Sequence, residues 1–195
     1  MTSIRRPAKA LELRRNLPHG ALVGVELAAQ FWVFGQYCPS GDLALFDYWA
    51  ASLPTKIEDI PRAKVAFRVA VSLYGLRRRR WVNFGVAPLA PPLDKAQKTA
   101  RRPIGSKSIY LDDFANFSVN DSVVISPARA RNLEKSAVYS LCHVEVRLME
   151  FFSGNEAARL STVFADYGWG ATEVEIVALE ARMLRHVNNM SARKQ

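Results

Sequence analysis

The chain has 195 residues, of which 49% are hydrophobic, and it carries a formal charge of +9 at pH 7. This composition is sufficient for one packed core and excludes a wholly disordered chain. The basic excess favours a polyanionic partner, either nucleic acid or an anionic membrane surface. The two cysteines, Cys38 and Cys142, lack CxxC spacing. They exclude a disulfide scaffold and a cysteine-based zinc module, and they suit a reducing compartment.

Residues 1–20 are predicted to form a basic N-terminal arm. They contain five Lys and Arg residues and one acid, Glu12, a composition that also bears a faint likeness to an organellar presequence. The apolar segment 21–37 follows. It is interrupted by Glu26 and Gln30, and it is shorter than the ~20 residues that cross a bilayer. The segment therefore predicts a core helix and no transmembrane span.

Segment 58–76 is predicted to be a second helix. Pro61 would lie in its first turn, where a missing amide hydrogen costs nothing. The apolar residues Phe67, Val71 and Tyr74 recur near the 3.6-residue period of an amphipathic helix.

Segment 126–152 predicts the longest helix. Ser126 is a suitable N-cap, and Pro127 would occupy the first helical position. Apolar residues then recur at alternating spacings of three and four: Ala130, Leu133, Ala137, Leu141, Val144, Leu148 and Phe151. A shorter helix is expected over residues 155–167, ending at the glycines that flank Trp169.

The last predicted helix begins at Thr172, and Glu175 completes a capping box with it. Its apolar face would consist of Ile176, Leu179, Met183, Val187 and Met190. The predicted fold class is therefore mainly α, a helical bundle with minor β structure. Its four main helices are residues 21–37, 58–76, 126–152 and 171–190.

The predicted domain covers residues 21–195 and contains an irregular basic insert at 77–131. The insert has 11 Lys and Arg residues against 4 acids, which is most of the net charge of the chain. It is also the least helical part of the sequence, because it contains a proline-rich stretch and a β-branched run. An anion-binding face is expected there.

Four consecutive arginines at 77–80 open this insert. One or two cations at a helix C-terminus complement its last carbonyl groups, but four exceed that role, although a solvated helix end stays the alternative. Arginine is suited to bidentate phosphate contacts, and an aromatic side chain beside the run could stack on unpaired bases. The predicted RNA-binding residues are Arg77, Arg78, Arg79, Arg80, Trp81, Arg101, Arg102, Arg129 and Arg131.

The sequence predicts no enzyme, cofactor or metal site. The three histidines are scattered without metal-ligand spacing. Cys142 and His143 are adjacent, but neighbouring side chains on a helix diverge by about 100° and would not pair with each other. Asp112 and Asp113 form an isolated carboxylate pair, which is interpreted as a cap or a solvated turn.

The segment from Arg129 to Gly170 resembles the C-terminal half of the coat proteins of rod-shaped plant RNA viruses, of the tobamovirus, benyvirus and furovirus type. The resemblance rests on a basic pair, Arg129 and Arg131, that opens a long apolar stretch, and then on Arg159, Phe164 and Trp169. It implies a four-helix bundle that stacks into a helical rod and holds genomic RNA in a groove. It also implies structural roles for the last three residues.

Two functions therefore stay open. The first is a non-enzymatic structural protein of a virion, which assembles with itself and packages single-stranded RNA, in a virion or the host cytoplasm. The alternative is an accessory subunit of an organellar ribonucleoprotein or respiratory complex, with a possible mitochondrial location. Both functions are expected to need no cofactor.

Overall fold

The computed structural model describes residues 17–54, 60, 63–72, 81–113, 123–164 and 172–192. The strands of the larger sheet are β1 (Ala21–Ala28), β2 (Phe31–Tyr37), β3 (Asp42–Ala50), β4 (Val65–Val71), β5 (Trp81–Val86) and β10 (Val138–Tyr139). The smaller sheet contains β6 (Lys98–Arg101), β7 (Ile109–Asp113), β8 (Val123–Ile125) and β9 (Glu134–Lys135). The helices are α1 (Pro127–Ala130), α2 (Leu141–Phe152), the 3-10 helix η4 (Glu156–Arg159) and α3 (Glu173–Ala192).

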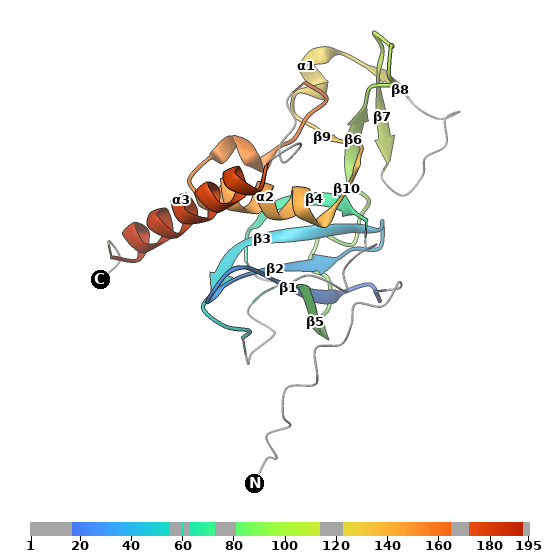
Figure 1. Cartoon of the computed structure of the whole chain (residues 1–195). Coiled ribbons are helices and arrows are strands. Elements are labelled where there is room, and N and C mark those ends of the chain that lie inside the picture. The colour runs from blue at the N-terminus through green and yellow to red at the C-terminus, as the bar shows by residue number, and fades with distance from the viewer. Residues whose placement is uncertain are drawn as a thin grey trace.

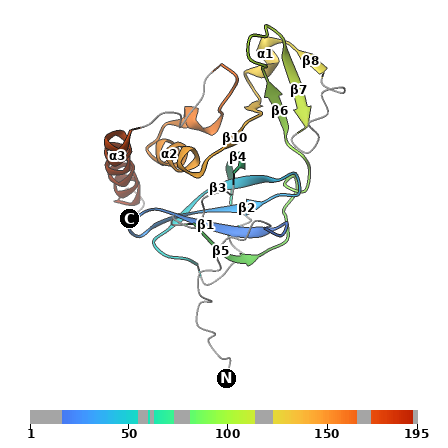
Figure 2. The same ribbon diagram turned by 45° about the vertical axis from the view of Figure 1, so that its right-hand side comes forward.

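The six-stranded sheet has the order β10-β4-β3-β2-β1-β5 and curves into a half-barrel. Its strands are antiparallel to their neighbours, except that β10 is parallel to β4. Helix α2 lies against one face of this sheet, and α3 packs on α2 (Figures 1 and 2). The small sheet has the order β8-β7-β6-β9. Together with α1 it lies at the end of the molecule opposite the C-terminus of α3 (Figure 1). The predicted four-helix bundle is therefore wrong.

Segment 21–37 is the first correction, because it forms the hairpin β1–β2 and no helix. Both faces of this hairpin are buried: Val23 and Val25 face the core shared with α2, while Leu22 and Phe34 face a second core on the outer side of the sheet. A strand buried on both faces is apolar at nearly every position and has no period-2 alternation. Such a run looks like a buried helix in the sequence.

Segment 58–76 is the second correction. It contains strand β4, in which Phe67 and Val69 are buried in the core shared with α2. Between them, Arg68 points the other way and donates to Asp42 Oδ2 at 2.5 Å. Side chains alternate between the two faces of a strand, which explains why a charged residue stands between two buried apolar ones. The predicted helical period skipped Val69 and so missed this alternation.

Segment 126–152 begins as predicted and then departs from the prediction. Ser126 caps α1 by accepting a hydrogen bond from the Arg129 N–H at 3.3 Å, and Pro127 is the first helical residue. The helix has only four residues, since the chain turns to pair β9 with β6 and β10 with β4. Only Leu141–Phe152 continues as helix. The predicted helix over 155–167 is reduced to η4 within the described residues.

The start of the last helix is confirmed. The Thr172 N–H and hydroxyl both donate to Glu175 Oε2 at 2.7 Å, and the Glu175 N–H donates back to the Thr172 hydroxyl at 3.3 Å. Three residues of its predicted apolar face are buried against the remainder of the core: Leu179, Met183 and Val187.

Candidate anion-binding groove

The small sheet borders an open groove of about 440 Å³. Its lining comes from the turn between β6 and β7, from β9 and from the segment after η4: Arg101, Arg102, Pro103, Ile104, Gly105, Ser106, Lys107, Lys135, Ser136 and Val163. Four of these residues are basic and none is acidic. The groove therefore collects positive charge from parts of the chain that are far apart in sequence.

The β6–β7 turn is closed by its own hydrogen bonds. The Ser106 N–H donates to the Pro103 carbonyl oxygen at 3.0 Å, and Arg102 Nε donates to the Ser106 carbonyl oxygen at 3.1 Å. Gly105 has a φ of +77°, in the left-handed region that favours glycine. This turn holds Arg102 and Lys107 beside the same groove.

The four cations differ in their partners. Arg101 Nε donates to Asp112 Oδ2 at 2.7 Å, and its guanidinium lies 5.4 Å from the centroid of the Tyr110 ring. Arg102 and Lys107 are exposed and form no ion pair with an acid in the part of the chain that the structure describes. The charges of these two residues are therefore available to an anion from solvent.

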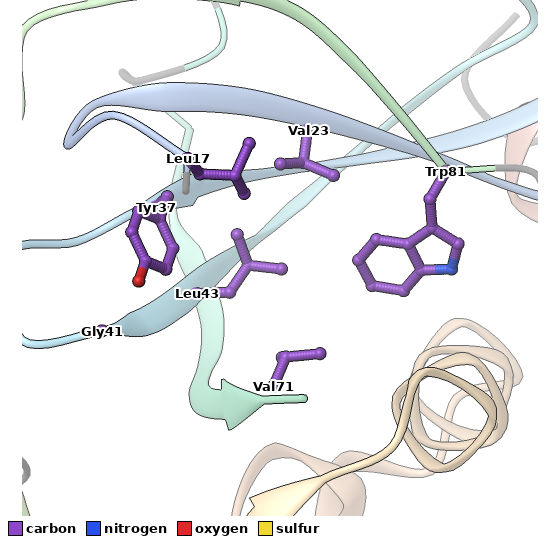
Figure 3. Close-up of a pocket in the computed structure, with 7 residues that line it drawn as sticks. All are labelled: Leu17, Val23, Tyr37, Gly41, Leu43, Val71 and Trp81. Carbon is purple, nitrogen blue, oxygen red and sulfur yellow. The ribbon is translucent and has the colours of Figure 1, made fainter. Parts of the chain in front are cut away.

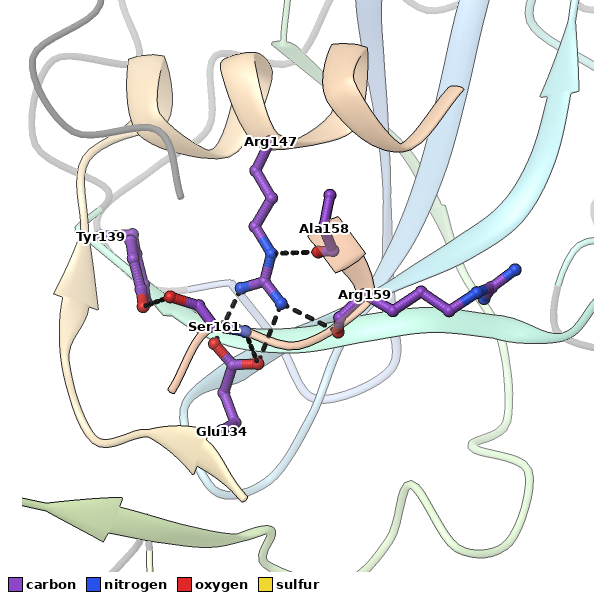
Figure 4. A network of polar contacts seen from close by, with 6 residues as sticks. All are labelled: Glu134, Tyr139, Arg147, Ala158, Arg159 and Ser161. Atoms are coloured by element: carbon purple, nitrogen blue, oxygen red, sulfur yellow. Dashed lines mark hydrogen bonds and ion pairs between the residues drawn. The ribbon is translucent and has the colours of Figure 1, made fainter. Parts of the chain in front are cut away.

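A buried ion pair joins the groove to α2. Arg147, on α2, donates from Nη1 and Nη2 to the two carboxylate oxygens of Glu134 at 2.7 and 2.9 Å (Figure 4). Both side chains are only 1% exposed. The Arg147 guanidinium also lies 4.0 Å from the centroid of the Phe67 ring on β4. This geometry anchors β9 to both α2 and the large sheet.

Backbone groups complete this network. Arg147 donates to the carbonyl oxygens of Ala158 and Arg159 at 2.7 and 2.9 Å, while Glu134 accepts from the Ser161 N–H at 3.3 Å. The Lys135 N–H donates to the Ser161 carbonyl oxygen at 2.6 Å. The network thus aligns β9 with the segment that leads to Val163, and these two segments form one side of the groove.

The predicted RNA-binding residues are dispersed by the fold. Arg101 and Arg102 line the groove, whereas Arg129 and Arg131 are exposed on and just after α1. Trp81 does not serve as predicted: it is 5% exposed, and its Nε1 donates to Glu145 Oε1 on α2 at 2.7 Å. A buried indole cannot stack on a base. Arg77, Arg78, Arg79 and Arg80 lie outside the described residues.

The residues with predicted structural roles also have distinct positions. Arg159 donates to Asp47 Oδ2 at 2.9 Å and pairs with Glu156, and its guanidinium lies 4.3 Å from the centroid of the Phe151 ring. Partial burial lowers the pKa of Arg159, but the hydrogen bonds to these two carboxylates outweigh that effect and raise it. Trp169 lies outside the described residues.

Phe164 is exposed to 44% and lies next to the groove residue Val163. The guanidinium of Arg131 is 5.6 Å from the centroid of its ring. An aromatic ring with an adjacent guanidinium can accept a stacked base or another planar group. The sequence predicted only a structural role for Phe164. The groove beside it forms when β9 pairs with β6, and the local sequence around Phe164 does not reveal that pairing.

A second cavity, inside the half-barrel, is too small for a ligand. It measures about 10 Å³, and its lining, which is almost wholly apolar, comes from strands β1 to β5 and the residues beside them: Leu17, Val23, Tyr37, Gly41, Leu43, Val71 and Trp81 (Figure 3). A space of this size can hold about one water molecule, so it cannot accept an organic ligand.

The Ser140, Cys142 and His143 side chains converge at the start of α2. The Ser140 hydroxyl oxygen lies 2.9 Å from both Cys142 Sγ and His143 Nδ1, so the two neighbours share one hydroxyl group. The other thiol, Cys38, is buried, and burial raises its pKa to about 11. Within the described ranges, no three His, Cys, Asp or Glu residues cluster in a way that could hold a metal ion.

None of the described helices combines the length and the apolar composition needed to cross a bilayer. No protein-family model matches the sequence, and comparison with curated proteins and with solved structures finds no similar chain. The function must therefore be argued from the groove itself.

Proposed function

We propose that this protein binds single-stranded RNA through the basic groove, without catalysing a reaction. The observation that carries the proposal is the convergence of four basic residues, and no acidic one, on a single depression. Guanidinium groups suit phosphate oxygens because they offer donors in a planar fork. Arg102 can offer such a fork and Lys107 an ammonium group, and neither has to break an ion pair to an acid of the described chain.

The exposed ring of Phe164 favours a single strand over a duplex. Its neighbour Val163 lines the groove, so a base whose phosphate lies in the groove has an aromatic ring close by. Base stacking on aromatic side chains tolerates any sequence and requires unpaired bases.

The likeness to rod-shaped coat proteins contributes little to this proposal. The four-helix bundle that it implies is not the fold of this chain, whose described residues form two sheets and three α-helices. We therefore propose RNA binding without stacking into a helical rod.

Fluorescence anisotropy with a labelled 12-nucleotide RNA tests the proposal. The variant Arg102→Gln/Lys107→Gln should bind about tenfold more weakly, and its plot of log K against log salt should flatten by about 1.4, or 0.7 for each lost phosphate contact. The control Arg182→Gln/Arg185→Gln removes two exposed cations from α3 and should leave the slope unchanged.

Two results would contradict the proposal. One is equal affinity of the groove variant and the control. The other is binding of anionic vesicles or polyglutamate, but not RNA, at physiological salt, because it would assign the groove to another class of partner.

A further inference from the structure

We infer that the groove takes a terminal phosphate of the RNA strand, a phosphomonoester, in preference to an internal phosphodiester. This inference rests on the proposed function and specifies its ligand. It follows from the presence of four basic side chains, and no acidic one, in the lining of one groove.

The charges are concentrated at one place. Arg102 and Lys107 lie at the two ends of one turn, which the bond from Arg102 Nε to the Ser106 carbonyl oxygen closes. Lys135 reaches the same groove from β9, because β9 pairs with β6 in parallel register, with Lys135 opposite Ala100. Arg102, Lys107 and Lys135 thus line one depression, whereas a strand held by internal phosphates calls for a row of cations along its path.

The ligand that suits such a depression has a high local charge. Each internal phosphodiester carries one negative charge and leaves two oxygens free. A terminal phosphomonoester carries about −1.5 to −2 charges at pH 7 and offers three acceptor oxygens. The terminal group therefore offers the cations that line the groove more negative charge and one more acceptor oxygen than a diester does.

The surroundings accommodate the remainder of the strand. The first base can stack on Phe164, which is half-exposed beside Val163. Arg131 lies against that ring and is itself exposed, so it can meet the next phosphate. Ser136 also lines the groove, and its buried hydroxyl oxygen has no hydrogen-bond partner in the described chain.

Anisotropy titrations with one 12-nucleotide RNA sequence test the inference, using three forms: a 5′-phosphate, a 3′-phosphate and hydroxyl groups at both ends. We expect one of the phosphorylated forms to bind at least tenfold more tightly than the hydroxyl form, and the comparison identifies the end. This preference should decline between pH 7.5 and 5.5, because the second pKa of a phosphomonoester is about 6.

Variants locate the preference. Lys107→Gln and Arg102→Gln, both at exposed positions, should reduce it to less than about threefold, while Arg185→Gln on α3 should retain it. Equal affinity of all three RNA forms would overturn the inference. The proposed function would then still stand if the groove variants bind RNA more weakly, whereas failure to bind any RNA would overturn both.

Discussion

Replacing Arg147 with Met tests the buried network most directly. The change removes the cation opposite Glu134, in a bidentate pair whose side chains are both 1% exposed. Truncating one partner leaves the other charge buried without compensation, which costs about 3–5 kcal/mol. The carbonyl groups of Ala158 and Arg159 lose their donor as well. We therefore expect the free energy of unfolding to fall by at least about 3 kcal/mol.

The double variant Glu134→Leu/Arg147→Met separates the charges from the backbone contacts. Apolar replacement of a whole buried ion pair is often neutral or stabilising. Here two carbonyl oxygens, the buried one of Ala158 and the part-buried one of Arg159, would lose the donor that Arg147 supplies. Each unsatisfied buried group costs about 1–3 kcal/mol. The double variant should therefore also lose roughly 1 kcal/mol or more.

Urea unfolding, followed by tryptophan fluorescence and far-UV circular dichroism, measures both losses. The control Arg182→Met breaks an ion pair with Glu150 whose side chains are 52% and 25% exposed, and it should cost no more than about 1 kcal/mol. A cost for Arg147→Met as small as that of the control would refute the reasoning. A double variant as stable as the wild type would refute the part that concerns the backbone groups.

Three further predictions concern single sites. Cys38 is buried, and the pKa of its thiol is raised to about 11. A thiol reagent at pH 8 should therefore modify at most one cysteine of the folded protein, and both cysteines in urea. Rapid modification of both cysteines in the folded protein would contradict this. Gly154→Ala should destabilise the protein by more than about 1 kcal/mol in urea unfolding, because φ is +88° and the new Cβ would lie 2.8 Å from the His186 ring; a neutral result would contradict this. The pKa of Glu175 is lowered first by the hydrogen bond from the Thr172 N–H and then by the one from its hydroxyl. The cap therefore stabilises the fold at a pH above the pKa that Glu175 has in the unfolded chain. This stabilisation is lost as the pH falls through the pKa of Glu175 in the folded protein. A carboxyl NMR titration should show a partial rise of that pKa in Thr172→Ala, because the variant loses the hydroxyl but keeps the backbone N–H. An unchanged value would exclude a contribution from the hydroxyl.

Part of the site was accessible from the sequence. The basic insert at 77–131 drew attention to Arg101 and Arg102, which do line the groove. Lys135 was missed because it lies outside the insert and reaches the groove only through the pairing of β9 with β6. The opposite error concerned Trp81: its place after four arginines suggested exposure, but its ring belongs to the core.

Local signals determined where α1 and α3 begin. The capping residues Ser126 and Thr172 act through contacts within three residues, so the sequence alone specifies them. How far an element extends, and whether an apolar run is helix or strand, was decided by tertiary structure. Segment 21–37 is a hairpin because the half-barrel has cores on both of its faces. Strand pairing joins residues that are distant in the chain, and a local pattern carries no record of such partners.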